Sequence, residues 1–149
     1  MKNFGVILFL LSLFWVAGCK SEPERAYTSP VLAEEWSVKM TVSGGIMGLL
    51  QSIEVQSDGA YAAADQRVGK IVKGEVTADD LATLEQLLST LKFSAPENPP
   101  ICADCFVFDI EIESGGRKML IHADDITTDD SGIGELVKFL RGLLETALK

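Results

Sequence analysis

One segment of this chain alternates apolar and polar residues at every position over seven residues, and a second does so over eight residues with Val107 as the one exception. This is the period of a β-strand, whose successive side chains point to opposite faces of a sheet. The segments run from Trp36 to Val42 and from Phe106 to Glu113. A regular apolar face has to be covered, so both predict strands with one buried and one solvated face. The predicted inward residues are Trp36, Val38, Met40, Val42, Phe106, Phe108, Ile110 and Ile112.

Three further segments have the extended character of strands. Leu50–Val55 and Tyr61–Val72 follow one another across a hairpin-type turn at Ser57–Ala60. Lys118–Ala123 is expected to pair with the segment before it across a tight turn at Glu113–Arg117. Each turn contains glycine, which is typical of a connection between neighbouring antiparallel strands.

Two segments have the period of an amphipathic helix. Thr77–Asp80 forms a capping box before a leucine stripe that runs from Leu81 to Leu91. Ser131–Leu148 predicts a second helix. The order of elements is ββ(β)–α–ββ–α, which predicts an α+β fold. We expect an antiparallel sheet of four to five strands with both helices on one face.

The first 18 residues are interpreted as an export signal. Lys2 precedes an apolar run, Phe4–Val16, that is shorter than the roughly 20 residues a membrane-spanning helix needs. Val16–Cys19 resembles the lipobox of bacterial lipoproteins, in which the cysteine is acylated and becomes the first mature residue. The alternative is a plain signal peptide with a chance cysteine.

The lipobox resemblance implies a location for the protein. Palmitate and other acyl chains on Cys19 would hold the protein to a lipid bilayer, because each buried CH₂ contributes about 0.8 kcal/mol. We therefore expect a lipid-anchored protein of the cell envelope. Lys20, rather than Asp, follows the cysteine. By the same resemblance this favours the outer membrane if the host has two membranes.

The mature chain divides into a linker and a domain. Residues 19–33 are polar with two prolines, which predicts a flexible tether before a single α+β domain at 34–149. Removal of the predicted signal takes away one charged residue, Lys2. The mature chain then has 12 Lys and Arg against 22 Asp and Glu, a net charge near −10. This excess of acid argues against nucleic acid as a partner, because phosphates are bound by Lys and Arg.

Cys102 and Cys105 form the most conspicuous pair of reactive side chains. An exported domain favours a structural disulfide between them. Their Cα atoms would have to lie roughly 4.4–6.8 Å apart, which requires a turn at Ala103–Asp104. Three alternatives stay open: reduced thiols, a redox site and a metal site. A redox site is disfavoured because reactive Cys-x-x-Cys motifs usually lie at a helix N-terminus, and here a strand is predicted to follow. A metal site is disfavoured because zinc needs about four ligands, and two cysteines and one histidine are too few.

Other polar residues give weaker signals. His122 is the only histidine and is interpreted as a surface residue of a strand. Asp124–Asp125 and Asp129–Asp130 do not have the spacing of an EF-hand, and they precede a helix whose N-terminal dipole favours acids. We therefore predict no catalytic residue, no metal ligand and no cofactor.

A glycine-rich connector follows the first alternating segment. Its three glycines allow positive φ, yet Ile46 and Met47 lie between them. Apolar side chains in such a connector are either packed into the core or offered to a partner. The predicted partner-binding loop consists of Ser43, Gly44, Gly45, Ile46, Met47 and Gly48.

The Ser-Gly-Gly-x-x-Gly motif at 43–48 resembles the opening motif of the emfourin family, which are small protein inhibitors of protealysin and related thermolysin-like metallopeptidases. The leucine helix ending at Phe93, the segment Ala103–Phe108, the next hairpin and the last helix are similar in order. Phe108 stands where the family usually has Tyr. The resemblance covers about residues 36–147. Departures are the lipoprotein signal, the cysteine pair and Met47.

The resemblance implies no enzyme activity and a rigid scaffold that presents a loop to a peptidase cleft. The first functional hypothesis is thus a membrane-tethered inhibitor of a thermolysin-like metallopeptidase, which requires Ile46 and Met47 to be exposed. The alternative is a non-enzymatic envelope lipoprotein whose domain binds another protein through a different surface, with this loop packed down. An enzyme or redox protein would instead need Cys102 or His122 in a cleft.

Overall fold

The computed structural model describes residues 26–95 and 102–149. The predicted signal, Cys19 and the first part of the predicted tether lie outside the described residues. Among the described residues, neither helix has the length and apolar character needed to cross a bilayer.

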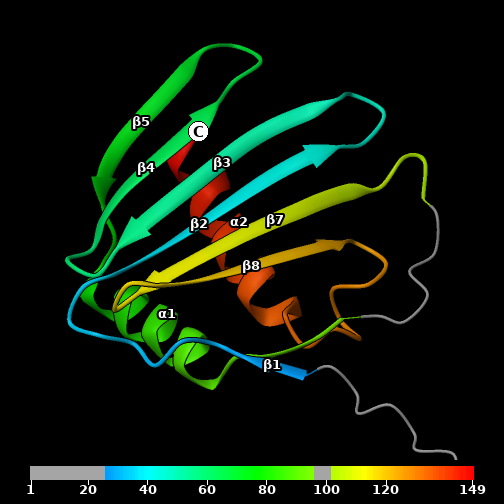
Figure 1. Cartoon of the computed structure of the whole chain (residues 1–149). Helices are drawn as coiled ribbons and strands as arrows, with labels where there is room; N and C mark the ends of the chain where they lie inside the picture. The colour runs from blue at the N-terminus through cyan, green and yellow to red at the C-terminus, as the bar shows by residue number, and fades with distance from the viewer. Residues whose placement is uncertain (1–25, 96–101) are drawn as a thin grey trace, which may run out of the picture.

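A six-stranded antiparallel sheet is the main element of the fold (Figure 1). Its strand order is β5-β4-β3-β2-β7-β8, so the two alternating segments are neighbours in the interior of the sheet. In that pair Met40 lies opposite Ile110. The strands are β2 (Trp36–Gly44), β3 (Leu49–Gln56), β4 (Ala60–Asp65), β5 (Lys70–Glu75), β7 (Phe106–Ser114) and β8 (Arg117–Asp124).

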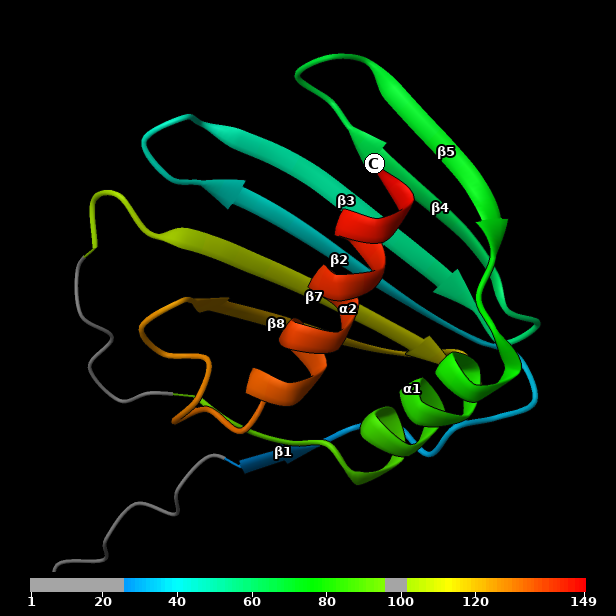
Figure 2. The ribbon, with the colours of Figure 1, turned by 180° about the vertical axis from the view of Figure 1, so that it is seen from behind.

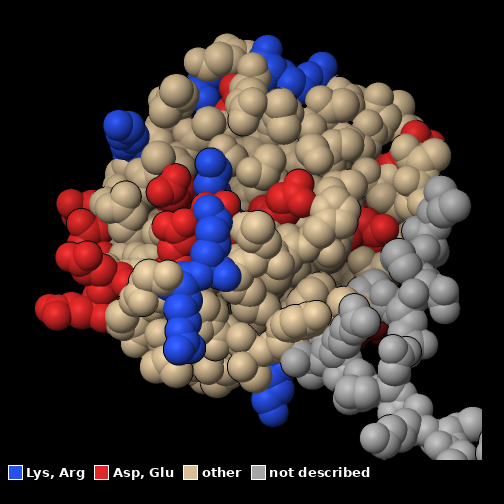
Figure 3. Space-filling view, in the orientation of Figure 1, with Lys and Arg blue, Asp and Glu red and all other residues tan. Residues whose placement is uncertain are grey.

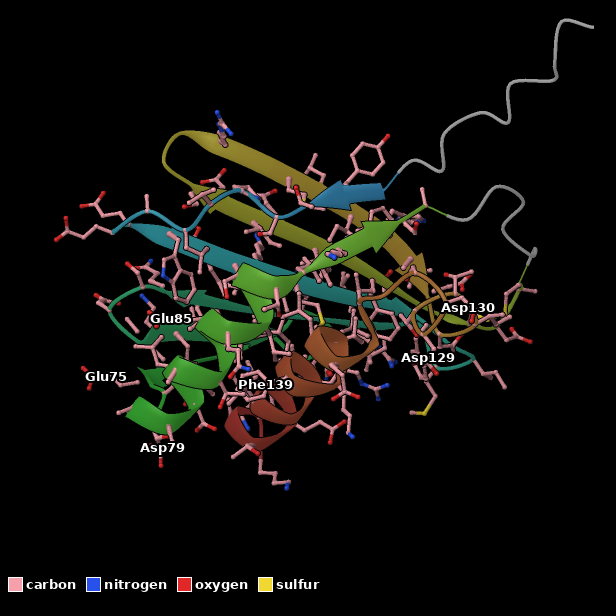
Figure 4. All side chains as sticks on the ribbon, turned by 90° about the horizontal axis from the view of Figure 1, so that it is seen from below. Glu75, Asp79, Glu85, Asp129, Asp130 and Phe139 are labelled. Carbon is pink, nitrogen blue, oxygen red and sulfur yellow. A yellow bond between two sulfur atoms is a disulfide. The ribbon has the colours of Figure 1, made fainter. Side chains whose placement is uncertain are left out.

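Both helices cover the same face of the sheet, so the fold has two layers (Figure 2). They are α1 (Ala78–Thr90) and α2 (Gly134–Ala147). Phe139, labelled in Figure 4, lies where α2 faces α1. The α+β class and the placement of both helices on one face are confirmed.

The core lies between the sheet and the helices. Seven of the eight predicted inward residues of β2 and β7 are buried, and Phe106, the first residue of β7, is half-buried. Both helices bury one stripe, as an amphipathic period requires. The helical and flanking residues of the core are Leu84, Leu88, Leu91, Ile133, Leu136, Val137, Leu140 and Leu144.

The sheet has more strands than the four to five expected. Tyr61–Val72 was expected to be one strand, but it contains parts of β4 and β5 and the turn between them. Asp65 accepts a hydrogen bond from the amide of Arg67, and Gly69 takes a φ of 68°. A carboxylate that caps a turn and a glycine at positive φ are ordinary turn signals. The adjacent alanines and Val68 obscured them.

A second, two-stranded sheet corrects the predicted tether. β1 (Ala26–Thr28) pairs with β6 (Lys92–Ser94), which extends from the end of α1. The ring of Tyr27 stacks on Phe93 with centroids 6.3 Å apart. The segment is docked further along as well, because the amide of Ser29 donates to the carbonyl oxygen of Leu91 at 3.3 Å and the amide of Ala33 donates to the hydroxyl of Ser114 at 2.7 Å.

The two helix starts differ in how they are capped. The hydroxyl of Thr77 accepts a hydrogen bond from the amide of Asp80 at 3.1 Å and donates one to the Asp80 carboxylate at 2.7 Å, which confirms the cap. The second helix begins at Gly134, not at Ser131, and Ile133 gives it no side-chain cap. Ser131 instead is buried in the preceding turn, where its hydroxyl donates to the carbonyl oxygen of Thr128.

Candidate binding loop

The glycine-rich connector forms a four-residue hairpin loop between β2 and β3. Gly44 and Leu49 are the last paired residues, and the amide of Gly48 donates a hydrogen bond to the carbonyl oxygen of Gly45 at 2.9 Å. Ile46 and Met47 are therefore the two central residues of a hydrogen-bonded β-turn. Their exposed fractions are 89% and 78%. The loop presents both apolar side chains to solvent instead of packing them on the core.

The first two glycines are required by the contacts at the base of the loop. Gly44 and Gly45 have φ values of 92° and 68°. A β-carbon on Gly44 would overlap the carbonyl oxygen of Cys105, and one on Gly45 would lie 2.6 Å from the ring of Phe106. The guanidinium of Arg141 lies 5.7 Å from the centroid of that ring. The loop is thus seated closely on the start of β7.

The disulfide lies directly beside this base. Cys102 and Cys105 are joined with their Cα atoms 5.6 Å apart, across a bend at Ala103–Asp104. The predicted turn and disulfide are therefore confirmed. The amide of Gly45 donates a hydrogen bond to the carbonyl oxygen of Cys105 at 3.1 Å. The sequence singled out both motifs but not their contact, because Gly45 and Cys105 are 60 positions apart in the chain.

The disulfide limits the chemistry of this corner. The sulfur atoms of Cys102 and Cys105 and a carboxylate oxygen of Asp125 lie within 4.8 Å of one another. A metal would need the cysteines as thiolates, and the disulfide consumes both. The ring that it closes is so short that the chain-entropy model gives only about 2 kcal/mol of stabilisation. Its main consequence is to restrain the backbone of residues 102–105, which lies next to the loop.

Two further turns at the same end of the sheet also expose apolar side chains. They carry Val68, between β4 and β5, and Ile126, after β8. The carboxylate of Asp124 accepts hydrogen bonds from the amide of Ile126 at 3.1 Å and from the hydroxyl of Thr127 at 2.8 Å. The bond from Thr127 is the main cause of a lowered pKa at Asp124. Likewise, the side chain of Gln51 lowers the pKa of Asp65.

Together these connections make up what we call the loop end of the sheet: residues 45–48, 66–69, 102–105 and 125–128. Six strands at about 4.8 Å spacing give this end a width of roughly 24 Å. Asp129 and Asp130 lie beside it, in the turns that precede α2 (Figure 4). The loop end thus combines apolar tips with neighbouring acids.

His122 lies on the uncovered face of the sheet, two residues before the end of β8. Its Nδ1 atom is 2.7 Å from the carboxylate of Asp109, and both side chains are largely exposed. Side chains of both charge signs lie beside one another over part of this face (Figure 3). The contact with Asp109 orients the His122 ring, and the cross-strand neighbour of Asp109 on β2 is Thr41.

A comparison with known proteins found no family model, no curated protein and no solved structure that matches this chain.

The sequence pointed to the loop and to the cysteine pair, but not to the exposed apolar side chains of the two neighbouring turns. Val68 and Ile126 are single apolar residues in polar turns. No periodic signal distinguishes such a residue from one packed inward. Only the strand order of the sheet places them at the same end as Ile46 and Met47.

Proposed function

We propose that this protein is a membrane-tethered inhibitor of a thermolysin-like metallopeptidase and that the loop 43–48 is its binding element. The observation that carries the proposal is the exposure of Ile46 and Met47 at the tip of a hydrogen-bonded turn. The resemblance of the 43–48 motif to the emfourin family supplies the class of partner. Thermolysin-like clefts favour bulky apolar residues just after the scissile bond, and these two side chains have that character.

The physical support is preorganisation. A loop that is already fixed loses little conformational entropy on binding, which leaves more of its contact energy as affinity. The turn hydrogen bond within 45–48 and the bond from Gly45 to Cys105 restrain this loop, and its three glycines allow the positive φ values that it needs. The exposed apolar side chains therefore project from a rigid base.

The tether is a separate part of the proposal. Acylation of Cys19 would place the domain at the membrane surface, with residues 20–25 as the link to β1. Mass spectrometry of the mature N-terminus tests this part. Diacylglyceryl or acyl mass on Cys19 supports it, whereas an unmodified mature N-terminus contradicts it. The inhibitory proposal does not depend on the outcome.

Inhibition is tested by titrating purified thermolysin-like metallopeptidases with the full chain in detergent. We expect inhibition that is competitive with a peptide substrate and saturates at one inhibitor per enzyme. The absence of inhibition across a panel that includes the host's own enzymes would contradict the proposal.

A second candidate is a non-enzymatic envelope lipoprotein that binds another protein partner through the uncovered face of the sheet. One observation favours it: both edge strands place exposed apolar side chains on this face, Ile71 on β5 and Leu120 on β8. Aspartate at these two positions would abolish such binding and leave the loop intact. If the loop is the binding element, these two substitutions should leave binding unchanged, whereas aspartate at Ile46 and Met47 should abolish it. The two double variants therefore distinguish the candidates.

A further inference from the structure

The Cys102–Cys105 disulfide lies under the candidate binding loop rather than in the core. Both cysteines are half-buried and β7 begins only after them, at Phe106. The carbonyl oxygen of Cys105 accepts the hydrogen bond from the amide of Gly45. This bond is the last hydrogen bond of the β2–β7 ladder, because it flanks the terminal pair of Gly44 with Phe106.

Cys105 is held by few groups. Within the part of the chain that the structure describes, its polar and covalent links are the disulfide and the bond from Gly45. The bond from Gly45 is the terminal hydrogen bond of the β2–β7 ladder, so the ladder holds the Cys105 carbonyl from one side and the disulfide holds Cys105 from the other. The disulfide therefore restrains the backbone torsions that aim this carbonyl at Gly45.

We propose that Cys102 and Cys105 are positioning residues for the loop 43–48: their disulfide keeps the terminal ladder bond from Gly45 to Cys105 closed, and its reduction releases the loop. The oxidised chain then presents Ile46 and Met47 in one conformation, whereas the reduced chain presents them in several. The proposal concerns the conformation of the loop. Its consequence for affinity rests on the proposed inhibitory function.

The redox step is an ordinary thiol–disulfide exchange with a dithiol. One thiolate of the dithiol attacks a cysteine sulfur, and the other cysteine leaves as a thiolate that takes up a proton. The second thiol of the dithiol then displaces the remaining cysteine. Two electrons pass to the protein, which ends with two cysteine thiols, and the dithiol ends as a disulfide.

The effect is expected to stay local. The core residues of β2 and β7 pair with each other through nine residues and lie under the helices. None of these contacts passes through Cys102. The affected contacts are the bond at Gly45 and the close approach of Gly44 to Cys105.

Amide hydrogen exchange measured by NMR on the full chain in detergent tests the proposal directly. Reduction with dithiothreitol should raise the exchange rate of the Gly45 amide by roughly three- to tenfold, the value of about one hydrogen bond. The amide of Met40, in the centre of the sheet, should not change. Reoxidation should restore the original rate at Gly45.

The variant Cys102→Ser/Cys105→Ser provides the control. Its Gly45 amide should exchange as in the reduced chain, and dithiothreitol should have no effect on it. Equal exchange at Gly45 in the oxidised and reduced chains would overturn the proposal. A rise that is as large at Met40 as at Gly45 would also overturn it, since it would show a general loss of stability.

Inhibition provides an independent readout. This measurement uses Cys102→Ser/Cys105→Ser instead of dithiothreitol, because a dithiol would also bind the zinc of a metallopeptidase. The variant should inhibit roughly three- to tenfold more weakly than the oxidised chain. Faster Gly45 exchange without inhibition by either chain would contradict only the proposed function. Equal inhibition by both chains with unchanged exchange would contradict only the positioning role.

Discussion

Gly44 and Cys105 approach so closely that a single β-carbon on Gly44 would overlap the carbonyl oxygen of Cys105. This contact joins two parts of the chain that are far apart in the sequence, the hairpin loop and the turn of the disulfide. It also explains why glycine is needed at position 44, where φ is 92°.

Gly44→Ala should therefore both destabilise the domain and displace the loop. We expect a loss of about 1–3 kcal/mol in the free energy of unfolding, from the strained φ and the overlap together. Gly116→Ala is the matched control, because Gly116 has a φ of 75° but open space around its Cα atom. Chemical denaturation of both variants measures the difference. An equal loss in the two would show that the contact with Cys105 contributes nothing.

The two faces of the sheet should respond very differently to truncation. Ile110→Ala removes a buried side chain from the central pair and should cost about 2–5 kcal/mol. Leu120→Ala, on the neighbouring strand but on the uncovered face, should change the free energy of unfolding by less than about 0.5 kcal/mol. Urea denaturation checks both. A large cost at Leu120 would mean that something covers this face.

Asp124 predicts a pH dependence of stability. The hydroxyl of Thr127 and the amides beside it lower the pKa of Asp124 below its ordinary 3.8. A lowered folded pKa gives a stabilisation that is full above the unfolded pKa and is lost as the pH falls through the folded pKa. The stability difference between the native chain and Asp124→Asn should therefore be largest above about pH 4 and shrink below it.

Thr127→Ser is the control for this dependence, since it keeps the hydroxyl that donates to Asp124. It should retain the pH profile of the native chain in thermal unfolding experiments. A stability difference for Asp124→Asn that is constant from pH 2 to pH 7 would show that the carboxylate is not stabilised in the folded state.

The cap of α1 gives a local test of stability. Thr77→Ala removes the oxygen that accepts from the amide of Asp80 and should cost about 1 kcal/mol. Thr77→Ser keeps this oxygen and should cost a few tenths of that value at most. Equal melting temperatures for Thr77→Ala and the native chain would contradict the role of the cap.

Residues with strict periodicity could be placed from the sequence. The alternation from Trp36 to Val42 identified a strand and its inward face because one regular period has one physical interpretation. The leucine stripe of α1 did the same for a helix. The segment Tyr61–Val72 was misjudged because its alanines have no clear preference and its turn lacked a strong glycine pair.

What the sequence could not give was the arrangement of non-local contacts. Residues 26–28 form a strand because β6 lies beside them, and three residues without a regular period are too short a segment to predict it. The meeting of Gly45 with Cys105 similarly depends on β2 and β7 being neighbours. Such pairings are set by tertiary packing, which overrides local preference.

The central claim is that Ile46 and Met47 bind a metallopeptidase cleft, and the most direct measurement is the inhibition constant of three chains. These are the native chain, Ile46→Asp/Met47→Asp, and the control Ile71→Asp/Leu120→Asp, whose two positions are also exposed but lie on the uncovered face of the sheet. We predict that the loop variant raises the inhibition constant by at least about 30-fold, as expected for a hot spot, and that the control changes it by less than about threefold. A loop variant that inhibits as strongly as the native chain would contradict the account.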